Sequence, residues 1–288
     1  MITPRKRSVS GAARLERWFT DRGWSPFPFQ RDVWAAYQRG ESGLIHAATG
    51  TGKTYAAWLG PVLEALEAGD SPRSPVERHN ADSLRVLWIT PLRALAADTM
   101  QALQAPIADL GLPWTVEART GDTSAAQRAK QRDRLPTALV TTPESLALLL
   151  CRADSAAIFR DLRCVVVDEW HELMATKRGV QVELCLARLR QRCPALRVWG
   201  VSATLGNLQT AADTLMGMDS SGVPRPACLI QGVVPKAVEI ESLIPESMDR
   251  FPWAGHLNTK LLPEVLRRLE TASSAIVFTN TRSQCEIW

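Results

Sequence analysis

Short apolar runs recur along the chain and alternate with segments of helical periodicity. A run of about four to eight apolar residues is typical of a strand that is buried on both faces, where alternation is lost. Strands that alternate with helices indicate a parallel sheet with helices on both faces, so the pattern predicts an α/β fold. The runs lie at residues 43–47, 85–90, 115–119, 138–142, 163–168 and 197–202.

The same pattern predicts how the chain is divided. Leu15, Trp18 and Phe19 recur at helical spacing near the start. Near the other end, residues 261–269 have a helical pattern and residues 275–278 a strand pattern, which would open a second α/β domain. We therefore expect an N-terminal tail and helix at 1–24, a first domain at 25–222, a linker at 223–244 and an incomplete second domain at 245–288.

A glycine loop follows the first apolar run and is itself followed by helix-forming residues. This order of strand, glycine loop and helix is that of a P-loop, whose backbone N–H groups bind phosphate oxygens at the positive end of a helix dipole. Ala47 stands where the strict pattern G-x-x-x-x-G-K-[ST] has its first glycine, so by that pattern the match is imperfect. Lys53 is expected to reach the β- and γ-phosphates and Thr54 to hold Mg²⁺. The residues expected to bind the nucleotide are Thr49, Gly50, Thr51, Gly52, Lys53 and Thr54.

Two adjacent acids, Asp168 and Glu169, end another apolar run and are followed by His171. Burying them is costly unless a positive group meets them, and a metal on the nucleotide would do so. We expect Asp168 to hold Mg²⁺ and Glu169 to orient and deprotonate water, a role that contributes about 10²–10⁴-fold. A solvated acidic turn is the alternative. His171 is expected to pass the state of the γ-phosphate to Ser202 and Thr204 rather than to be a plain surface histidine.

Gln30 lies a short distance before the P-loop. Its amide can pair with both a donor and an acceptor on an adenine edge, which would make it part of the nucleotide site. An ordinary polar residue in the first turn of a helix is the alternative interpretation.

Composition and charge add weaker limits. There are 34 Lys and Arg against 30 Asp and Glu, and this net charge of +4 permits a polyanionic partner without arguing for one. The six cysteines form no C-x-x-C pair, which is typical of buried thiols in a reducing compartment. The basic start lacks an apolar signal region and no run of about 18 apolar residues occurs, so we expect a cytoplasmic protein with no membrane partner.

Together these motifs resemble those of the superfamily 2 helicases, over residues 27 to 282. In that superfamily alanine is an accepted first residue of motif I, which removes the objection to Ala47. The matching segments are Gln30 as the Q motif, 47–54 as motif I, 90–95 as motif Ia, 141–144 as motif Ib, 168–171 as a DExH motif II and 202–204 as motif III.

Within the superfamily the chain resembles the large helicase-related family and, in that family, the ligase-associated DExH helicases. The resemblance is carried by residues 167–173, 202–207, 250–256 and 278–282, with Trp170 inside motif II as the most distinctive position. It implies two RecA-like domains, ATP and Mg²⁺ as cofactors, and 3′-to-5′ movement on single-stranded or tailed duplex DNA. It also implies a role in DNA repair, with repair proteins such as a ligase as partners.

The resemblance further implies which residues contact the DNA backbone. Backbone contact suits a motor, which must step over any sequence. The basic helix at 128–134 is more simply interpreted as a solvated face. The implied contacts are Thr90, Arg93, Gly121, Asp122 and Thr142 in the first domain and Thr279, Asn280 and Arg282 in the second, with Ser202 and Thr204 as coupling residues.

Motifs V and VI, with the arginine finger of the family, do not occur before Trp288. The chain is therefore expected to be an N-terminal fragment that hydrolyses ATP poorly, because an arginine finger supplies about 10³–10⁵ in rate. Two alternatives stay open: an RNA helicase, and a nucleotide-responsive nucleic-acid-binding module without turnover. A P-loop kinase of small molecules would leave the Ser-Ala-Thr and Thr-Pro-Glu motifs unexplained.

Overall fold

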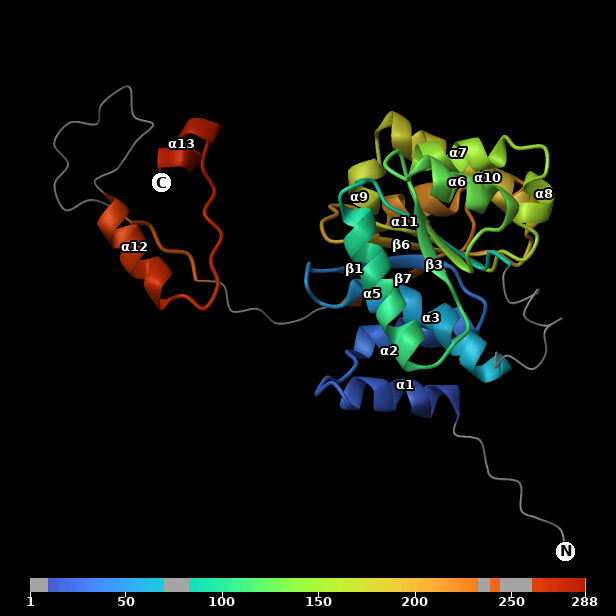
Figure 1. The fold of residues 1–288 in the computed structure, drawn as a ribbon, viewed down its shortest axis with the longest axis horizontal. Coiled ribbons are helices and arrows are strands. Elements are labelled where there is room, and N and C mark those ends of the chain that lie inside the picture. Colours follow the sequence, from blue (N-terminus) through green and yellow to red (C-terminus); the bar gives the residue numbers. More distant parts are fainter. Residues whose placement is uncertain (1–9, 70–82, 233–238, 244–260, 288) are drawn as a thin grey trace, which may run out of the picture. The chain divides into compact units, whose positions relative to one another are not determined.

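The computed structural model describes residues 10–69, 83–232, 239–243 and 261–287 (Figure 1). The chain forms two compact units, Met1–Val234 and Pro235–Trp288.

In its described part, the first unit contains a seven-stranded sheet in which every strand pair is parallel. The strand order is β3-β4-β2-β5-β6-β1-β7, and this confirms the parallel α/β sheet predicted from the apolar runs. All six strands that were predicted for the first domain are present. The strands are β1 (Gly43–Ala47), β2 (Val86–Ile89), β3 (Val116–Arg119), β4 (Ala138–Thr141), β5 (Cys164–Val167), β6 (Arg197–Ser202) and β7 (Cys228–Gly232).

The last strand, β7, lies inside the segment 223–244 that the sequence suggested as a linker, and it belongs to the first unit. It pairs with β1 from Gly43 opposite Cys228 to Ala47 opposite Gly232. The two backbones approach so closely that a Cβ at Gly43 would lie 2.2 Å from the Cys228 carbonyl oxygen. β7 is an edge strand with one exposed and one half-buried face, so it lacks the continuous apolar run by which the other strands were predicted.

Helices cover both faces of the sheet, as the sequence predicted, and α1 extends the core by packing on α3 (Figure 1). None of the described helices combines the length and the apolar character that crossing a bilayer requires. One face carries α1 (Gly11–Thr20), α2 (Pro28–Gln38), α3 (Lys53–Ala68) and α5 (Leu95–Asp109). On the other side lie α6 (Ala125–Asp133), α7 (Pro143–Leu150), α8 (Ser155–Ile158), α9 (Trp170–Leu173), α10 (Lys177–Arg192) and α11 (Leu208–Met216).

The hydrophobic core has two parts, one on each face of the sheet. Alternate residues of one strand enter different parts, because successive side chains of a strand point to opposite faces. In β5, Val166 packs on the side of α3 and α5, while Val165 and Val167 pack on the side of α7 and α10. Burial on both faces explains why the central strands are apolar throughout.

The second unit contains α12 (Leu262–Thr271) and α13 (Arg282–Ile287) in its described residues. The predicted helix at 261–269 is therefore confirmed, but the predicted strand at 275–278 is wrong. Phe278 is 90% exposed, and the described part of this unit offers no neighbouring strand with which the segment could pair. A strand needs such a neighbour, because its N–H and C=O groups have no partners within the strand itself.

Candidate active site and nucleic-acid interface

The sheet order brings three motifs to one edge. β5, β6 and β1 are neighbours, so their carboxyl ends place the Asp168–Glu169 pair, Ser202 and the P-loop side by side. Ligands of open α/β sheets bind outside this carboxyl edge. Segments more than 100 residues apart in the chain therefore form a single site.

The P-loop curls through two glycines in the left-handed region, Gly50 with φ +80° and Gly52 with φ +79°. A Cβ at Gly52 would also lie 2.6 Å from the Gln30 amide nitrogen, so this position requires glycine for two reasons. Thr51 Oγ1 donates to the Ala48 carbonyl oxygen at 2.7 Å and closes the loop. Gly52 is the N-cap of α3, so the first N–H groups of that helix point into the loop, as anion binding requires.

Lys53 begins α3 and is buried beside the loop. Its Nζ donates to the Ala47 carbonyl oxygen at 2.7 Å, which places the ammonium at the end of β1. Thr54 is half-buried, whereas Thr49 and Gly50 are exposed at the tip of the loop.

Gln30 lies in the first turn of α2 and is only 2% exposed. Its Oε1 accepts from the Phe27 N–H at 2.8 Å and its Nε2 donates to the Gly52 carbonyl oxygen at 2.9 Å. The amide thus joins the start of α2 to the P-loop. A contact between Gln30 and adenine stays a prediction.

Asp168 directly follows β5 and has a raised pKa of about 6. Burial is the main cause and the charge of Glu169 adds to it, while a hydrogen bond from Trp88 and the charge of Lys53 oppose the shift. Trp88 Nε1 donates to Oδ2 at 3.1 Å, and the Glu169 N–H donates to Oδ1 at 3.0 Å. A partly buried carboxylate whose charge is so incompletely compensated fits a divalent cation, and Mg²⁺ prefers oxygen ligands.

Glu169 has a left-handed backbone, with φ 46° and ψ 47°, which is strained for a residue with a side chain. Its Oε2 is buried and has no hydrogen-bond partner among the residues that the structure describes. The Nδ1 of His171 lies 3.5 Å from this oxygen. A carboxylate held in a strained backbone with one oxygen unused is suited to accept a proton from a ligand.

His171 lies between the acidic pair and the end of β6. Its Nδ1 is 3.1 Å from Ser202 Oγ, and Ser202 is fully buried. Thr204 lies two residues further and is exposed. The structure thus brings His171 and Ser202 together, and their role in coupling stays a prediction.

A groove of about 510 Å³ lies beside this site and contains three of the predicted nucleic-acid contacts, Arg93, Gly121 and Thr142. Asp122 adjoins it, because Arg93 Nη1 donates to Asp122 Oδ1 at 2.8 Å. The groove is formed by the segments that follow β2, β3 and β4. Its other lining residues are Pro91, Leu92, Arg119, Thr120, Arg128, Glu144, Ser145, Leu148 and Arg178.

Thr90 is a predicted contact that does not line the groove, and its contact with nucleic acid stays a prediction. Its side chain is fully buried, and its N–H donates to the Thr141 carbonyl oxygen at 2.9 Å. Thr90 extends the hydrogen bonding between β2 and β4 by one residue, so it supports the turn that carries Arg93.

Three arginines that line the groove were not predicted from the sequence as nucleic-acid contacts. Arg128 was assigned to a solvated basic face and is indeed exposed; in addition it donates to the Gly121 carbonyl oxygen at 2.6 Å and lines the groove. Arg119 and Arg178 had no signal of their own. Against these arginines and Arg93, the groove lining has Glu144 as its acid, so positive charge prevails there, as contact with a phosphate backbone requires.

The predicted contacts of the second unit are grouped at the start of α13. Thr279 Oγ1 donates to the Thr281 carbonyl oxygen at 3.2 Å, and the Asn280 N–H donates to Gln284 Oε1 at 3.0 Å. Arg282 is the first residue of the helix. Their contact with nucleic acid stays a prediction.

Comparison with known proteins decides the family. The sequence matches the DEAD/DEAH box helicase family over residues 27–211. The chain belongs to this family. Its sheet is accordingly that of a RecA-like helicase domain, as the resemblance implied.

Among the DEAD/DEAH box helicases, the chain is similar to Lhr proteins. It is 34% identical over 292 residues to an Lhr helicase and probable uracil glycosylase of Mycolicibacterium smegmatis, covering 96% of this chain and 18% of that protein. It is 31% identical over 284 residues to the ATP-dependent helicase Lhr-Core protein 2 of Thermococcus barophilus, covering 94% of this chain and 32% of that protein.

A solved structure extends this similarity to three dimensions. The structure of Mycobacterium smegmatis helicase Lhr bound to ssDNA and AMP-PNP superposes with a TM-score of 0.72 and 29% identity, covering 97% of this chain and 36% of that chain. The chain therefore spans between about a fifth and a third of the two curated relatives.

Proposed function

We propose that this chain binds ATP with Mg²⁺ at the carboxyl edge of its sheet and contributes to an ATP-driven helicase acting on single-stranded DNA. The observation that carries the proposal is Glu169, a strained carboxylate with one buried oxygen that lacks a described partner, beside Asp168 and the P-loop. A similar Lhr structure holds ssDNA and AMP-PNP, which supports both ligands.

In the proposed site, the residues have separate tasks. The N–H groups of residues 50–54 would bind the phosphates, and Lys53 would neutralise charge on the β- and γ-phosphates. Thr54 and Asp168 would hold Mg²⁺, which supplies charge neutralisation between those phosphates when it is bound. Glu169 would take the proton of the attacking water, and His171 would hold Glu169 in position and contact Ser202 as the coupling element.

The DNA strand would lie along the arginine-lined groove, with Arg93, Gly121, Asp122 and Thr142 at its backbone. We extend the proposal to 3′-to-5′ movement, to tailed duplex substrates and to DNA repair with partners such as a ligase, on the resemblance to Lhr-type helicases. A cytoplasmic location is also proposed, and it is supported by six cysteines that lie in described segments as free thiols.

The activity of these 288 residues alone is a separate proposal. We expect weak nucleotide binding and slow hydrolysis, because motif VI does not occur in the sequence and an arginine finger supplies about 10³–10⁵ in rate. Two alternative functions remain: a helicase that acts on RNA, and a module that binds nucleotide without hydrolysing it.

The test measures Mg²⁺-dependent binding of AMP-PNP and the ATP hydrolysis rate, with and without single-stranded DNA or RNA. Glu169→Gln should keep binding and lose hydrolysis by about 10²–10⁴-fold, while Lys53→Ala should lose binding. Equal hydrolysis by the unchanged chain and Glu169→Gln would overturn the assigned site. Preference for strands with a 2′-OH would overturn DNA as the substrate. Binding with no measurable hydrolysis, also in a chain extended through motif VI, would favour a nucleotide-responsive module.

A further inference from the structure

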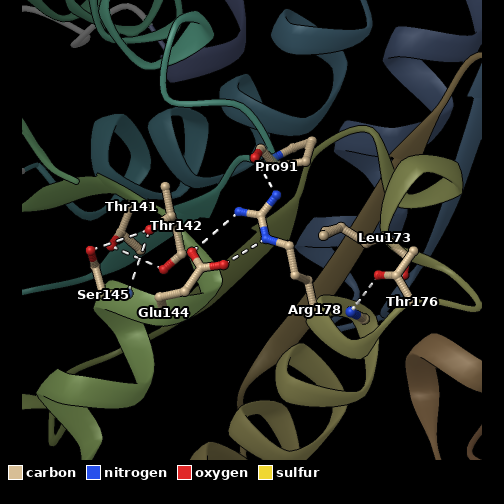
Figure 2. Close-up of polar contacts among 9 residues, drawn as sticks. Pro91, Thr141, Thr142, Glu144, Ser145, Leu173, Thr176 and Arg178 are labelled. Atoms are coloured by element: carbon tan, nitrogen blue, oxygen red, sulfur yellow. Dashed lines mark hydrogen bonds and ion pairs between the residues drawn. The ribbon is translucent and has the colours of Figure 1, made fainter. Parts of the chain in front are cut away.

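Arg178 connects three segments of the first unit: α10, to which it belongs, the first turn of α7 and the turn after β2. It lies in the first turn of α10, and its Nε and Nη2 donate to the two carboxylate oxygens of Glu144 at 2.6 and 3.2 Å. Its Nη1 donates to the Pro91 carbonyl oxygen at 2.6 Å. Figure 2 shows the guanidinium between the first turn of α7 and the turn after β2, so all three of its nitrogens have partners in other elements.

The backbone of Arg178 is fixed to the helix that follows the catalytic acid. Glu169 is the N-cap of α9, and α9 ends at Leu173. Thr176 Oγ1 donates to the Leu173 carbonyl oxygen at 2.6 Å (Figure 2). Gly179 packs on the same carbonyl, because a Cβ there would lie only 2.2 Å from that oxygen. Because these contacts are closely packed, a shift of α9 should also move the first turn of α10.

The two partners of Arg178 belong to the groove. Pro91 starts the turn that carries Arg93, and Glu144 lies in the first turn of α7, whose N-cap is Thr142. Although burial would raise the pKa of Glu144, the hydrogen bonds and charge of Arg178 lower it, so Glu144 is held ionised. Because the guanidinium of Arg178 already makes two hydrogen bonds to a carboxylate, it holds α10 and α7 together and is not free to bind a phosphate.

We propose that Arg178 is a positioning residue that couples the nucleotide site to the groove by setting the spacing between residues 90–93 and the first turn of α7. Movement of α9 on nucleotide binding would displace Arg178 and, through it, both walls of the groove. The inference rests on the proposed function, since it needs both ligands. Lysine cannot replace the residue, because an ammonium lacks the planar fork that serves Glu144 and Pro91 together.

The test is the ratio of ssDNA dissociation constants measured with and without saturating AMP-PNP and Mg²⁺. A residue that merely supports the fold would change both constants together, whereas a coupling residue changes their ratio. The unchanged chain should show a ratio of at least about five, and Arg178→Gln and Arg178→Lys should bring it to within about two-fold of one. Arg188→Gln, on an exposed position of the same helix, is the matched control and should keep the ratio.

A double-mutant cycle identifies the partner. Glu144→Gln should reduce the ratio, though less than Arg178→Gln does, because it leaves the bond from Arg178 to the Pro91 carbonyl oxygen. The double variant should show no further reduction beyond Arg178→Gln, because that change already removes the contact with Glu144. Thermal unfolding of each variant separates loss of fold from loss of coupling, and Glu144→Gln tests the contact if Arg178 variants do not fold.

The outcomes distinguish this inference from the proposed function. If the unchanged chain binds no ssDNA, or binds it equally with and without AMP-PNP, the proposed coupling of two sites fails and the inference fails with it. If the unchanged chain is coupled and folded Arg178→Gln keeps the ratio, only the inference is overturned. The same holds if Arg188→Gln loses the ratio equally, since the effect would then not belong to Arg178.

Discussion

At the scale of single residues, the site keeps a carboxylate where the fold alone would prefer a neutral group. Burial raises the pKa of Asp168 to about 6, above its usual value of about 4. The ionised form therefore destabilises the folded chain at neutral pH when no cation is bound. Such an unfavourable group is commonly found where a ligand completes the site.

Asp168→Asn should make the metal-free chain more stable at pH 8, because the amide removes a buried charge. The gain should be only on the order of 1 kcal/mol, because the amide oxygen can accept from Trp88 but its NH₂ would then face the Glu169 N–H. Since the pKa of Asp168 is raised in the folded chain, the destabilisation by its ionised form is fully present above pH 6 and disappears as the pH falls toward 4. The advantage of the variant should shrink over that range in urea unfolding without Mg²⁺. Asp32→Asn on the exposed side of α2 is the control and should show no such trend.

At the scale of elements, one polar network joins α2, α3 and β6. Arg197 donates through Nη1 and Nη2 to Glu64 at 2.9 Å each, and the Tyr37 hydroxyl donates to Glu64 at 3.0 Å. The Arg197 guanidinium also lies 4.2 Å from the centre of the Tyr37 ring. Burial opposes ionisation of Glu64, but the bonds and charge of Arg197 prevail and lower the pKa of Glu64.

Glu64→Gln should therefore destabilise the chain at pH 7 by about 1–3 kcal/mol, because it leaves a half-buried arginine without its carboxylate. A lowered folded pKa gives stability that is present above the unfolded value near 4 and lost as the pH falls through the folded value. The two proteins should thus converge in denaturant unfolding below about pH 4. A difference that stays constant from pH 7 to pH 3 would contradict the ionic contribution.

The contact between α9 and α10 predicts a second effect at this scale. Alanine within a helix is normally about 1 kcal/mol better than glycine. Gly179→Ala should instead destabilise the chain by about 1–3 kcal/mol, because its Cβ would collide with the Leu173 carbonyl oxygen and force the two helices apart. Urea unfolding measures the change, and a stabilised variant would show that the contact can relax.

What the sequence could predict depended on how local each feature is. The central strands are apolar on both faces, so each could be predicted from its own residues. β7 could not, because it forms a strand by pairing with β1, which is distant in the sequence. Lys53, Asp168 and Glu169 could be predicted as candidate site residues because their motifs are contiguous, and their roles stay predictions. Arg178 was not found, because its partners Pro91 and Glu144 are 87 and 34 residues away and only the folded sheet brings them together.

At the scale of the whole molecule, the net charge of +4 gave little indication of a polyanionic ligand. The fold concentrates positive charge locally, by carrying arginines from β3, α6 and the turn after β2 to one groove. Burial lowers the pKa of Arg119, and the nearby charges of Arg152, Arg128 and Arg132 lower it further, as expected where like charges lie close together. Local concentration of charge determines binding to a polyanion more than the total does.

This crowding predicts a salt-dependent affinity for single strands. Each phosphate contact contributes about −0.7 to the slope of log K against log salt concentration. Arg119→Gln and Arg128→Gln should each make the slope shallower by about 0.7, measured by fluorescence anisotropy with a single-stranded oligonucleotide. Arg160→Gln, an exposed arginine that does not line the groove, should leave the slope unchanged. Equal slopes in all variants would remove these arginines from the interface.

The position of β1 between β6 and β7 also has a consequence for biosynthesis. The strand that carries the P-loop leaves the ribosome early, yet both of its partners are among the last strands of this unit to be made. At about 5–20 residues per second, the nascent chain would hold this apolar strand unpaired for on the order of ten seconds or more. During translation, that segment is the one most exposed to wrong pairing and to chaperones, and the ability to hold a nucleotide should emerge only near the end.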